Sequence, residues 1–164
     1  MFDPTRSSFV AELHSRTSGY PGRIGVTPRS PNVTPVPWSG WLAIMGNDRD
    51  DHVLQAIRFR FDYRETRADR IHYAVSAVSD NERWHGKHLG VSRNGYLGFY
   101  SEEQPAFKLE LINPWDGINP LDFYFRNADG ERVGVYETQG VKMLNTQTAQ
   151  ADILQFSAVR ILRA

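Results

Sequence analysis

The chain contains no cysteine among its 164 residues, which excludes disulfide bonds, thiolate metal sites and cysteine nucleophiles. Small proteins of oxidising compartments often rely on disulfides, so this absence favours the cytoplasm, or export without a cleavable signal peptide. No run of about 18 apolar residues occurs, which excludes a membrane-spanning helix. The first 22 residues also lack the apolar segment of a signal peptide.

An excess of charge of either sign is also missing. Lys and Arg together number 19, as do Asp and Glu. This balance argues against a nucleic-acid-binding protein, which would normally carry a basic patch. Catalytic signatures are absent too: the chain has no G-x-S-x-G, no phosphate-binding glycine loop and no H-E-x-x-H. We therefore expect a non-enzymatic protein that needs no cofactor.

Helical patterns are scarce after residue 22. Residues 1–22 are rich in Ser, Thr, Arg and Gly, and we expect an N-terminal arm there, with a short helix over SSFVAELHSR or disordered. Residues 27–38 carry four prolines, which excludes a central strand. Over 23–164, short runs rich in Val, Ile, Phe and Tyr are interrupted by Gly, Asn, Asp and Pro, which predicts one all-β domain. The charged segment 63–70 predicts a long turn or one helical turn.

A repeat of about 45 residues runs through this domain. A glycine opens each unit, at Gly40, Gly86 and Gly130, and an aromatic strand closes it. In the second unit, Asn94-Gly95 stands between two alternating runs, which predicts a hairpin. The residues that we expect to be equivalent buried anchors of the units are Phe59, Phe107 and Phe156, together with Leu89, Val91, Val133 and Val135.

Each unit thus contains a strand, a glycine turn, a hairpin and a closing strand. One such unit cannot bury its own apolar face, but three units arranged about an axis can. A threefold set of four-stranded units is a β-trefoil, and we expect that fold. Another β-barrel or a β-sandwich is the alternative, because glycine hairpins and aromatic strands occur in both.

The stretch HGKHLGVSRNGYLGFYSEEQPAFKLELI, residues 85–112, resembles a β-trefoil unit of the fascin-like and fibroblast-growth-factor-like kind. Units two and three match this pattern, whereas unit one departs because its hairpin turn reads GNDRDDH. The resemblance implies a fold whose members bind sugars, inhibit proteases, bind receptors or bundle actin. The sugar motif of ricin-type trefoils is absent, since Gly90 and Gly134 stand where its Asp would be and Gln155-Phe156-Ser157 replaces Gln-x-Trp.

The segment NPWDGINP, residues 113–120, is the first candidate site. Prolines bracket a tight loop in which Trp115 offers an apolar face for a sugar ring, while Asp116 and Asn119 offer hydrogen-bonding groups for its hydroxyls. The alternative is a turn whose tryptophan closes one end of the barrel.

The segment DNERWHGKH is the second candidate, with Trp84 and His85 as ligand-binding residues. His85 and His88 lack a third metal ligand at a suitable spacing, so we expect no metal site there, although a weak one stays open as an alternative. The acidic turn at 46–52 lacks the EF-hand pattern and is expected to be a solvated turn, although a weak metal site there stays open.

The arginines between residues 58 and 70 form the last candidate. Neighbouring Asp and Glu residues neutralise them, so we expect a surface of ion pairs and not an anion site. The arginines concerned are Arg58, Arg60, Arg64, Arg67 and Arg70.

Taken together, these patterns predict a lectin-like, carbohydrate-binding protein. The alternatives are a trefoil protease inhibitor, presenting loop 113–120 or SEEQPAF to an active-site cleft, and a protein-binding or actin-bundling module. We expect a glycan or a protein surface as the partner and no nucleic acid.

Overall fold

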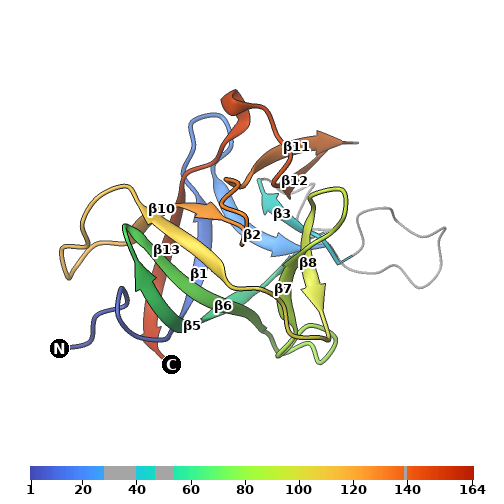
Figure 1. Ribbon diagram of the computed structural model, residues 1–164. Coiled ribbons are helices and arrows are strands. Elements are labelled where there is room, and N and C mark those ends of the chain that lie inside the picture. Colours follow the sequence, from blue (N-terminus) through green and yellow to red (C-terminus); the bar gives the residue numbers. More distant parts are fainter. Residues whose placement is uncertain (28–39, 47–53, 139) are drawn as a thin grey trace.

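The computed structural model of the protein describes residues 1–27, 40–46, 54–138 and 140–164. These residues form β-structure and, apart from one 3-10 turn, η2 (Gln150–Asp152), they contain no helix (Figure 1). The all-β prediction is therefore confirmed. The chain of antiparallel pairings β1–β5–β6–β9–β10–β13 returns to β1, so six strands close into a barrel. These strands are β1 (Phe9–Ser15), β5 (Arg58–Arg67), β6 (Arg70–Val78), β9 (Phe107–Leu111), β10 (Leu121–Arg126) and β13 (Phe156–Arg163).

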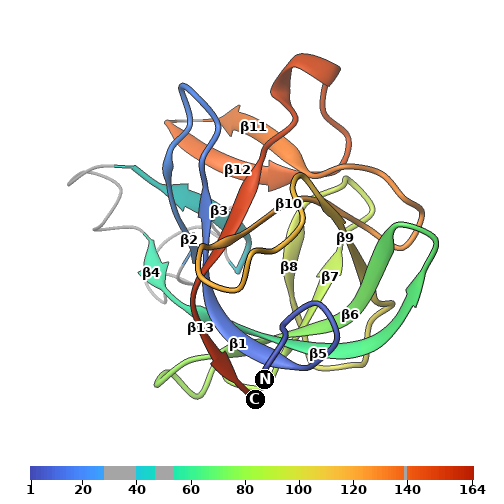
Figure 2. The ribbon, with the colours of Figure 1, turned by 90° about the vertical axis from the view of Figure 1, so that its left-hand side faces the viewer.

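The other strands form three hairpins against one end of this barrel (Figure 2). The hairpins touch one another in a ring: an isolated bridge joins the first to the second, another joins the second to the third, and β12 pairs with β3 to complete it. Their strands are β2 (Gly22–Val26) with β3 (Leu42–Met45) and the short β4 (Gln55–Ala56), then β7 (His88–Val91) with β8 (Leu97–Tyr100), and β11 (Gly134–Thr138) with β12 (Val141–Asn145).

The repeat glycines have a conformational reason. Gly40, Gly86 and Gly130 all have a positive φ, between 79° and 85°, which an L side chain rarely adopts. The predicted hairpin at Asn94-Gly95 is also present, with its turn between β7 and β8. The 45-residue period therefore reflects a backbone requirement that recurs in each unit.

The core fills the barrel with aromatic rings. Alternating burial along β6 and β10 sends every second side chain inward, as a half-buried strand requires. The three closing-strand phenylalanines are at most 2% exposed, which confirms them as buried anchors. Leu89, Val133 and Val135 are buried as expected, whereas Val91 is half-buried at the edge of the core.

The expectation for residues 1–22 was wrong in one respect. Instead of a helix or a disordered arm, Phe9–Ser15 form β1, which pairs with both β5 and β13 and so completes the barrel. Phe9 is fully buried and stacks on Phe61 with 4.7 Å between ring centroids. The local pattern of this segment suits a helix as well as a strand, and tertiary pairing decides between them.

The expectation for residues 63–70 also failed. The charged run continues β5 to Arg67, a turn at Ala68 and Asp69 follows, and β6 begins at Arg70. Strand pairing with β6 holds this segment extended, so its charged side chains lie on the outside of a hairpin. At the other end of the chain, the segment ADILQFSAVRIL forms β13 from Phe156 onward.

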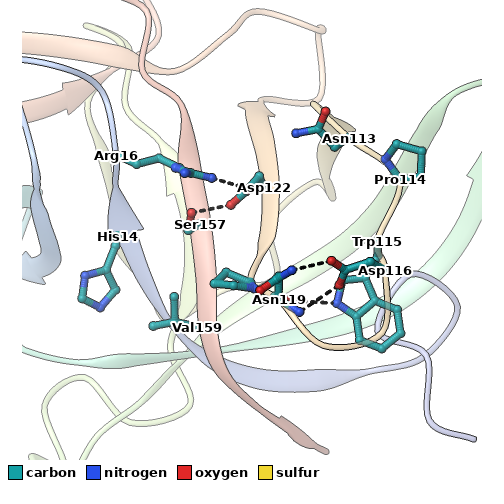
Figure 3. A pocket seen from close by; sticks show the side chains of 11 residues that line it. His14, Arg16, Asn113, Pro114, Trp115, Asp116, Asn119, Asp122, Ser157 and Val159 are labelled. Carbon is teal, nitrogen blue, oxygen red and sulfur yellow. Dashed lines mark hydrogen bonds and ion pairs between the residues drawn. The ribbon is translucent and has the colours of Figure 1, made fainter.

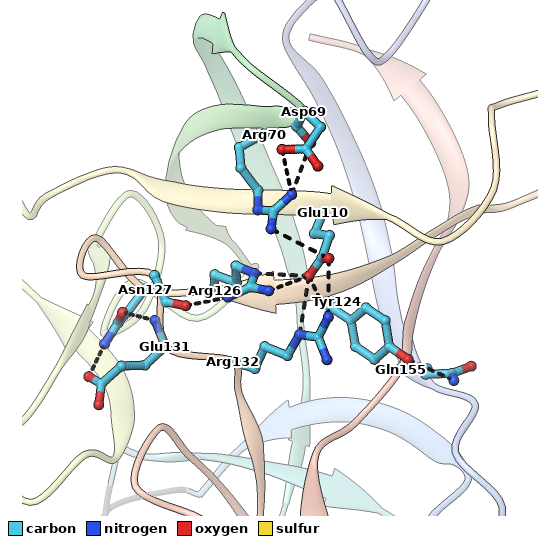
Figure 4. A network of polar contacts seen from close by, with 10 residues as sticks. Asp69, Arg70, Glu110, Tyr124, Arg126, Asn127, Glu131, Arg132 and Gln155 are labelled. Carbon is cyan, nitrogen blue, oxygen red and sulfur yellow. Dashed lines mark hydrogen bonds and ion pairs between the residues drawn. The ribbon is translucent and has the colours of Figure 1, made fainter. Parts of the chain in front are cut away.

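A polar network holds the outside of the barrel between β6, β9 and β10 (Figure 4). Glu110 contacts three arginines: Arg126 at 2.7 Å, Arg132 at 2.9 Å and Arg70 at 3.5 Å. Arg132 also lies over the ring of Tyr124, 3.9 Å from its centroid. Partial burial acts to raise the pKa of Glu110, but the hydrogen bonds and charges of Arg126 and Arg132 outweigh it and hold that pKa below its ordinary value.

Candidate functional site

A cleft of about 580 Å³ opens on the outside of the barrel beside β1, β13 and β10 (Figure 3). One wall is the loop of residues 113–120 that connects β9 to β10, called the proline loop below. We call the whole cavity the loop cleft. The lining side chains of its other wall are His14, Arg16, Asp122, Ser157 and Val159.

Strand register builds the polar floor of the loop cleft. His14 on β1 and Asp122 on β10 are both direct partners of Ser157 on β13, so the three residues form one row across neighbouring strands. The Ser157 hydroxyl donates a hydrogen bond to Asp122 Oδ1 at 2.5 Å. Arg16 makes an ion pair with the same carboxylate while its side chain stays 51% exposed. The floor therefore offers charged donors and acceptors to the cleft.

The proline loop is held by its own side chains. Asp116 Oδ1 accepts hydrogen bonds from the backbone N–H groups of Asn119, at 2.8 Å, and Ile118, at 2.9 Å, and Oδ2 accepts one from the Asn119 amide. Together these hydrogen bonds lower the pKa of Asp116 below its ordinary value, and the bond from the Asn119 backbone contributes most. Trp115 Nε1 donates to the Asn119 carbonyl at 3.0 Å. The loop is thus cross-braced through Asp116 and Asn119.

The apolar residues of the proline loop have different surroundings. Trp115 is half-buried and packs against the barrel core, so one part of its ring is structural. Ile118 donates its backbone N–H to Asp116, but its side chain is 90% exposed. A groove of about 410 Å³ lies beyond Trp115, between the proline loop and the middle of β13.

His14 connects the loop cleft to a second carboxylate. Its Nε2 lies 3.1 Å from Glu12 Oε1, and Glu12 also meets Arg23 at 3.7 Å and Arg160 at 3.5 Å. Partial burial acts to raise the pKa of Glu12, but the hydrogen bond with His14 and the charges of Arg23 and Arg160 outweigh it and lower that pKa. Glu12 thereby fixes the orientation of the imidazole at the cleft wall.

The structure brings some predicted site residues together and separates others. Trp115, Asp116 and Asn119 all line the loop cleft. Trp84 is a core residue, 6% exposed, whose Nε1 donates to Gln55 Oε1 at 3.2 Å. His85 is exposed and lines a different cleft. Most of the acidic turn at 46–52 lies outside the described residues.

Sequence reasoning missed the polar floor of the cleft. His14, Arg16, Asp122 and Ser157 come from three segments that are far apart in the chain. The alternation His14-x-Arg16 would have placed both side chains on one face, had residues 9–15 been interpreted as a strand. No local signal joins them to Asp122 or Ser157, since only barrel closure does so.

The serine and the histidine of the loop cleft have separate partners. The Ser157 hydroxyl donates to Asp122 and the His14 ring pairs with Glu12, so serine and histidine are engaged by different carboxylates instead of by each other. Within the described residues, no three His, Asp or Glu side chains are placed to hold a metal ion. The same part of the chain contains no helix with the length and apolarity to cross a membrane.

Neither protein-family models nor curated proteins yielded a match to this chain.

Proposed function

We propose that the protein is a non-enzymatic carbohydrate-binding module of β-trefoil architecture, with its sugar site in the loop cleft. The support for the architecture is the alternation of barrel strands and hairpins, together with the ring of contacts among the three hairpins. Each hairpin follows the first barrel strand of its unit, and the units recur with the 45-residue period of the sequence.

One observation carries the sugar-binding proposal: an indole, two prolines and a row of polar side chains line one cleft (Figure 3). A sugar presents an apolar C–H face and a rim of hydroxyls, so it needs both surfaces at once. Trp115, Pro114 and Pro120 form the first surface. Arg16 and Asp122 form the second, with a cationic donor next to an anionic acceptor.

The bracing of the proline loop assigns new roles to two residues. Asp116 and Asn119 already bond to each other and to the loop backbone, so they hold Trp115 in place and are not the main partners of the sugar. A loop that is already ordered before binding lowers the entropic cost of binding a ligand.

A glycan array of the whole protein tests this proposal. Wild type should bind a defined set of glycans. Trp115→Ala should abolish this binding, and Asp122→Asn should weaken it by about 10- to 100-fold, because a charged hydrogen-bond acceptor is lost. Asp129→Asn, the same change on an exposed turn outside the cleft, is the matched control.

Since Trp115 also packs on the core, the melting temperature of each variant must be measured in parallel. Asp122→Asn then gives a second test that does not alter packing. Full binding by both variants, or no glycan bound by wild type, would remove the loop cleft as a sugar site.

A protease inhibitor is the second candidate function, and the proline loop favours it. The loop presents Ile118, which is 90% exposed, above a frame of internal hydrogen bonds, and a protease active site accepts a rigid, protruding segment of this kind. A panel of proteases should then show one that is inhibited by wild type and not by Ile118→Asp. Glu103→Ala in the alternative loop SEEQPAF should inhibit as well as wild type does.

A further inference from the structure

A second cleft, of about 310 Å³, lies where the end of β6 meets β2, β4 and β5. We call it the arginine cleft, and it shares no residue with the loop cleft. The polar residues that line it are Arg23, Gln55, Arg58, Ser79, Asp80 and His85.

Two guanidinium groups give this cleft its positive charge. Arg23 is held in place, because its Nη2 donates to the Ile57 carbonyl at 3.1 Å and its Nη1 lies 3.7 Å from Glu12 Oε1. Arg58 projects from the outer face of β5 and, contrary to the ion pairs expected for this strand and found at Arg60, makes no ion pair with any residue that the structure describes. One of the two cations is thus fixed and the other is available to a ligand.

Two further side chains add hydrogen-bond donors. His85 Nδ1 accepts a hydrogen bond from the Ser79 backbone at 3.2 Å, which leaves the ring proton of the neutral imidazole on Nε2. Gln55 Oε1 accepts from Asn81 Nδ2 and from Trp84 Nε1, both at 3.2 Å. The acceptor of that amide is therefore occupied, and its NH₂ group is the end left for a ligand.

We infer that the arginine cleft binds an oxyanion, either the phosphate or the carboxylate group of a small ligand. Guanidinium, amide and imidazole donors match the acceptor oxygens of such a group. Among the described residues that line the cleft, Asp80 is the only carboxylate, against the two guanidinium groups of Arg23 and Arg58. Glu12, outside this lining, already meets Arg23, so Arg58 is the cation left for a ligand. The Glu110 network shows the contrasting case, in which three arginines are already satisfied by a carboxylate of the protein itself.

Titration of the whole protein with inorganic phosphate and, separately, with acetate tests this inference. Ionic strength is held constant with chloride, and backbone amide shifts are followed by NMR. We expect saturable shifts at residues 55–58 and 79–85, and the tighter of the two anions identifies the class of ligand group.

Three substitutions of exposed residues make the test specific. Arg58→Gln should weaken anion binding by about tenfold or more, because a charge-assisted donor is lost. Asp80→Asn should tighten anion binding, since it removes a negative charge that repels the anion. Arg64→Gln, an equal change of charge on the same strand and outside the cleft, should leave binding within about twofold of wild type.

Absence of saturable shifts with both anions would overturn the inference. An equal loss in Arg58→Gln and Arg64→Gln would overturn it too, because binding would then follow the general charge of the surface. Glycan binding by Arg58→Gln should match wild type, so the outcome here is independent of the loop cleft.

Discussion

Two carboxylates on the outer wall of the barrel have similar exposure and opposite surroundings. Glu110 is 21% exposed and is enclosed by Arg70, Arg126 and Arg132, none of them more than 27% exposed (Figure 4). Asp122 is 17% exposed, but its cation, Arg16, is 51% exposed at the edge of the loop cleft. The first carboxylate is surrounded by protein, whereas the second faces a cavity.

This difference separates a structural role from a binding role. Glu110 binds cations from β6 (Arg70), from β10 (Arg126) and from the segment after β10 (Arg132), and so connects these segments. Its carboxylate oxygens therefore have little capacity left for a ligand. Asp122, with one half-exposed cation and one hydroxyl as partners, keeps acceptor capacity for a ligand. The two sites should therefore respond to substitution in opposite ways.

The largest effect on stability should come from Glu110→Gln. This change leaves three arginines together without their shared anion, so we expect a loss of about 2–3 kcal/mol, somewhat less than for a fully buried pair. Urea denaturation measures it. Glycan and phosphate binding of the folded variant should be unchanged, and a loss below about 0.5 kcal/mol would show that the network is not structural.

The Glu110 network should also make the stability of wild type depend on pH more strongly than that of Glu110→Gln. The folded-state pKa of Glu110 lies below its ordinary value of 4.5, so its stabilising contribution is complete above pH 4.5 and is lost as the pH falls through the folded pKa. Wild type should therefore lose more stability than Glu110→Gln as the pH falls from 5 through the folded pKa of Glu110. Parallel curves for the two proteins would contradict this expectation.

Asp122→Asn should have a smaller effect on stability, of about 1 kcal/mol or less, because Arg16 is half-exposed and solvent screens the pair. Its effect on glycan binding should exceed its effect on folding, which is the reverse of Glu110→Gln. Measuring both properties on both variants tests the comparison directly. A loss of stability equal to that of Glu110→Gln would make Asp122 a second structural carboxylate.

Ile118→Asp should have the smallest effect on stability, within about 0.5 kcal/mol, because its side chain is 90% exposed. Thermal unfolding measures this change. A clear drop in melting temperature would mean that Ile118 packs against the protein, and the proline loop would then not present it to a partner.

The sequence predicted the barrel better at its closing strands than at its first strand. Phe59, Phe107 and Phe156 are recognisable because an aromatic anchor recurs with a fixed period, and the same period identifies the glycine turns. Phe9–Ser15 has no such counterpart in the pattern, and its apolar spacing suits two secondary structures. Its pairing with β5 and β13, both distant in sequence, makes it a strand.

The candidate site, too, could be predicted from the sequence only in part. Trp115, Asp116 and Asn119 could be selected from eight consecutive residues, since prolines and a glycine mark the segment as a loop. The roles of these residues could not be predicted from the sequence, because the pairing of Asp116 with Asn119 depends on the conformation of the loop. Trp84 shows the same limit, since an aromatic residue among polar neighbours proved to be part of the core.

By itself, the sequence determined the all-β class, the positions of the glycine turns and the buried aromatic anchors, because glycine conformation, strand alternation and aromatic spacing act over short distances. Only the tertiary structure decided that Arg16, Asp122 and Ser157 share one cleft, and that Arg23, Arg58 and His85 share another. The physical reason is barrel closure, which joins β1 to β13 across nearly the whole chain. No local pattern encodes that register.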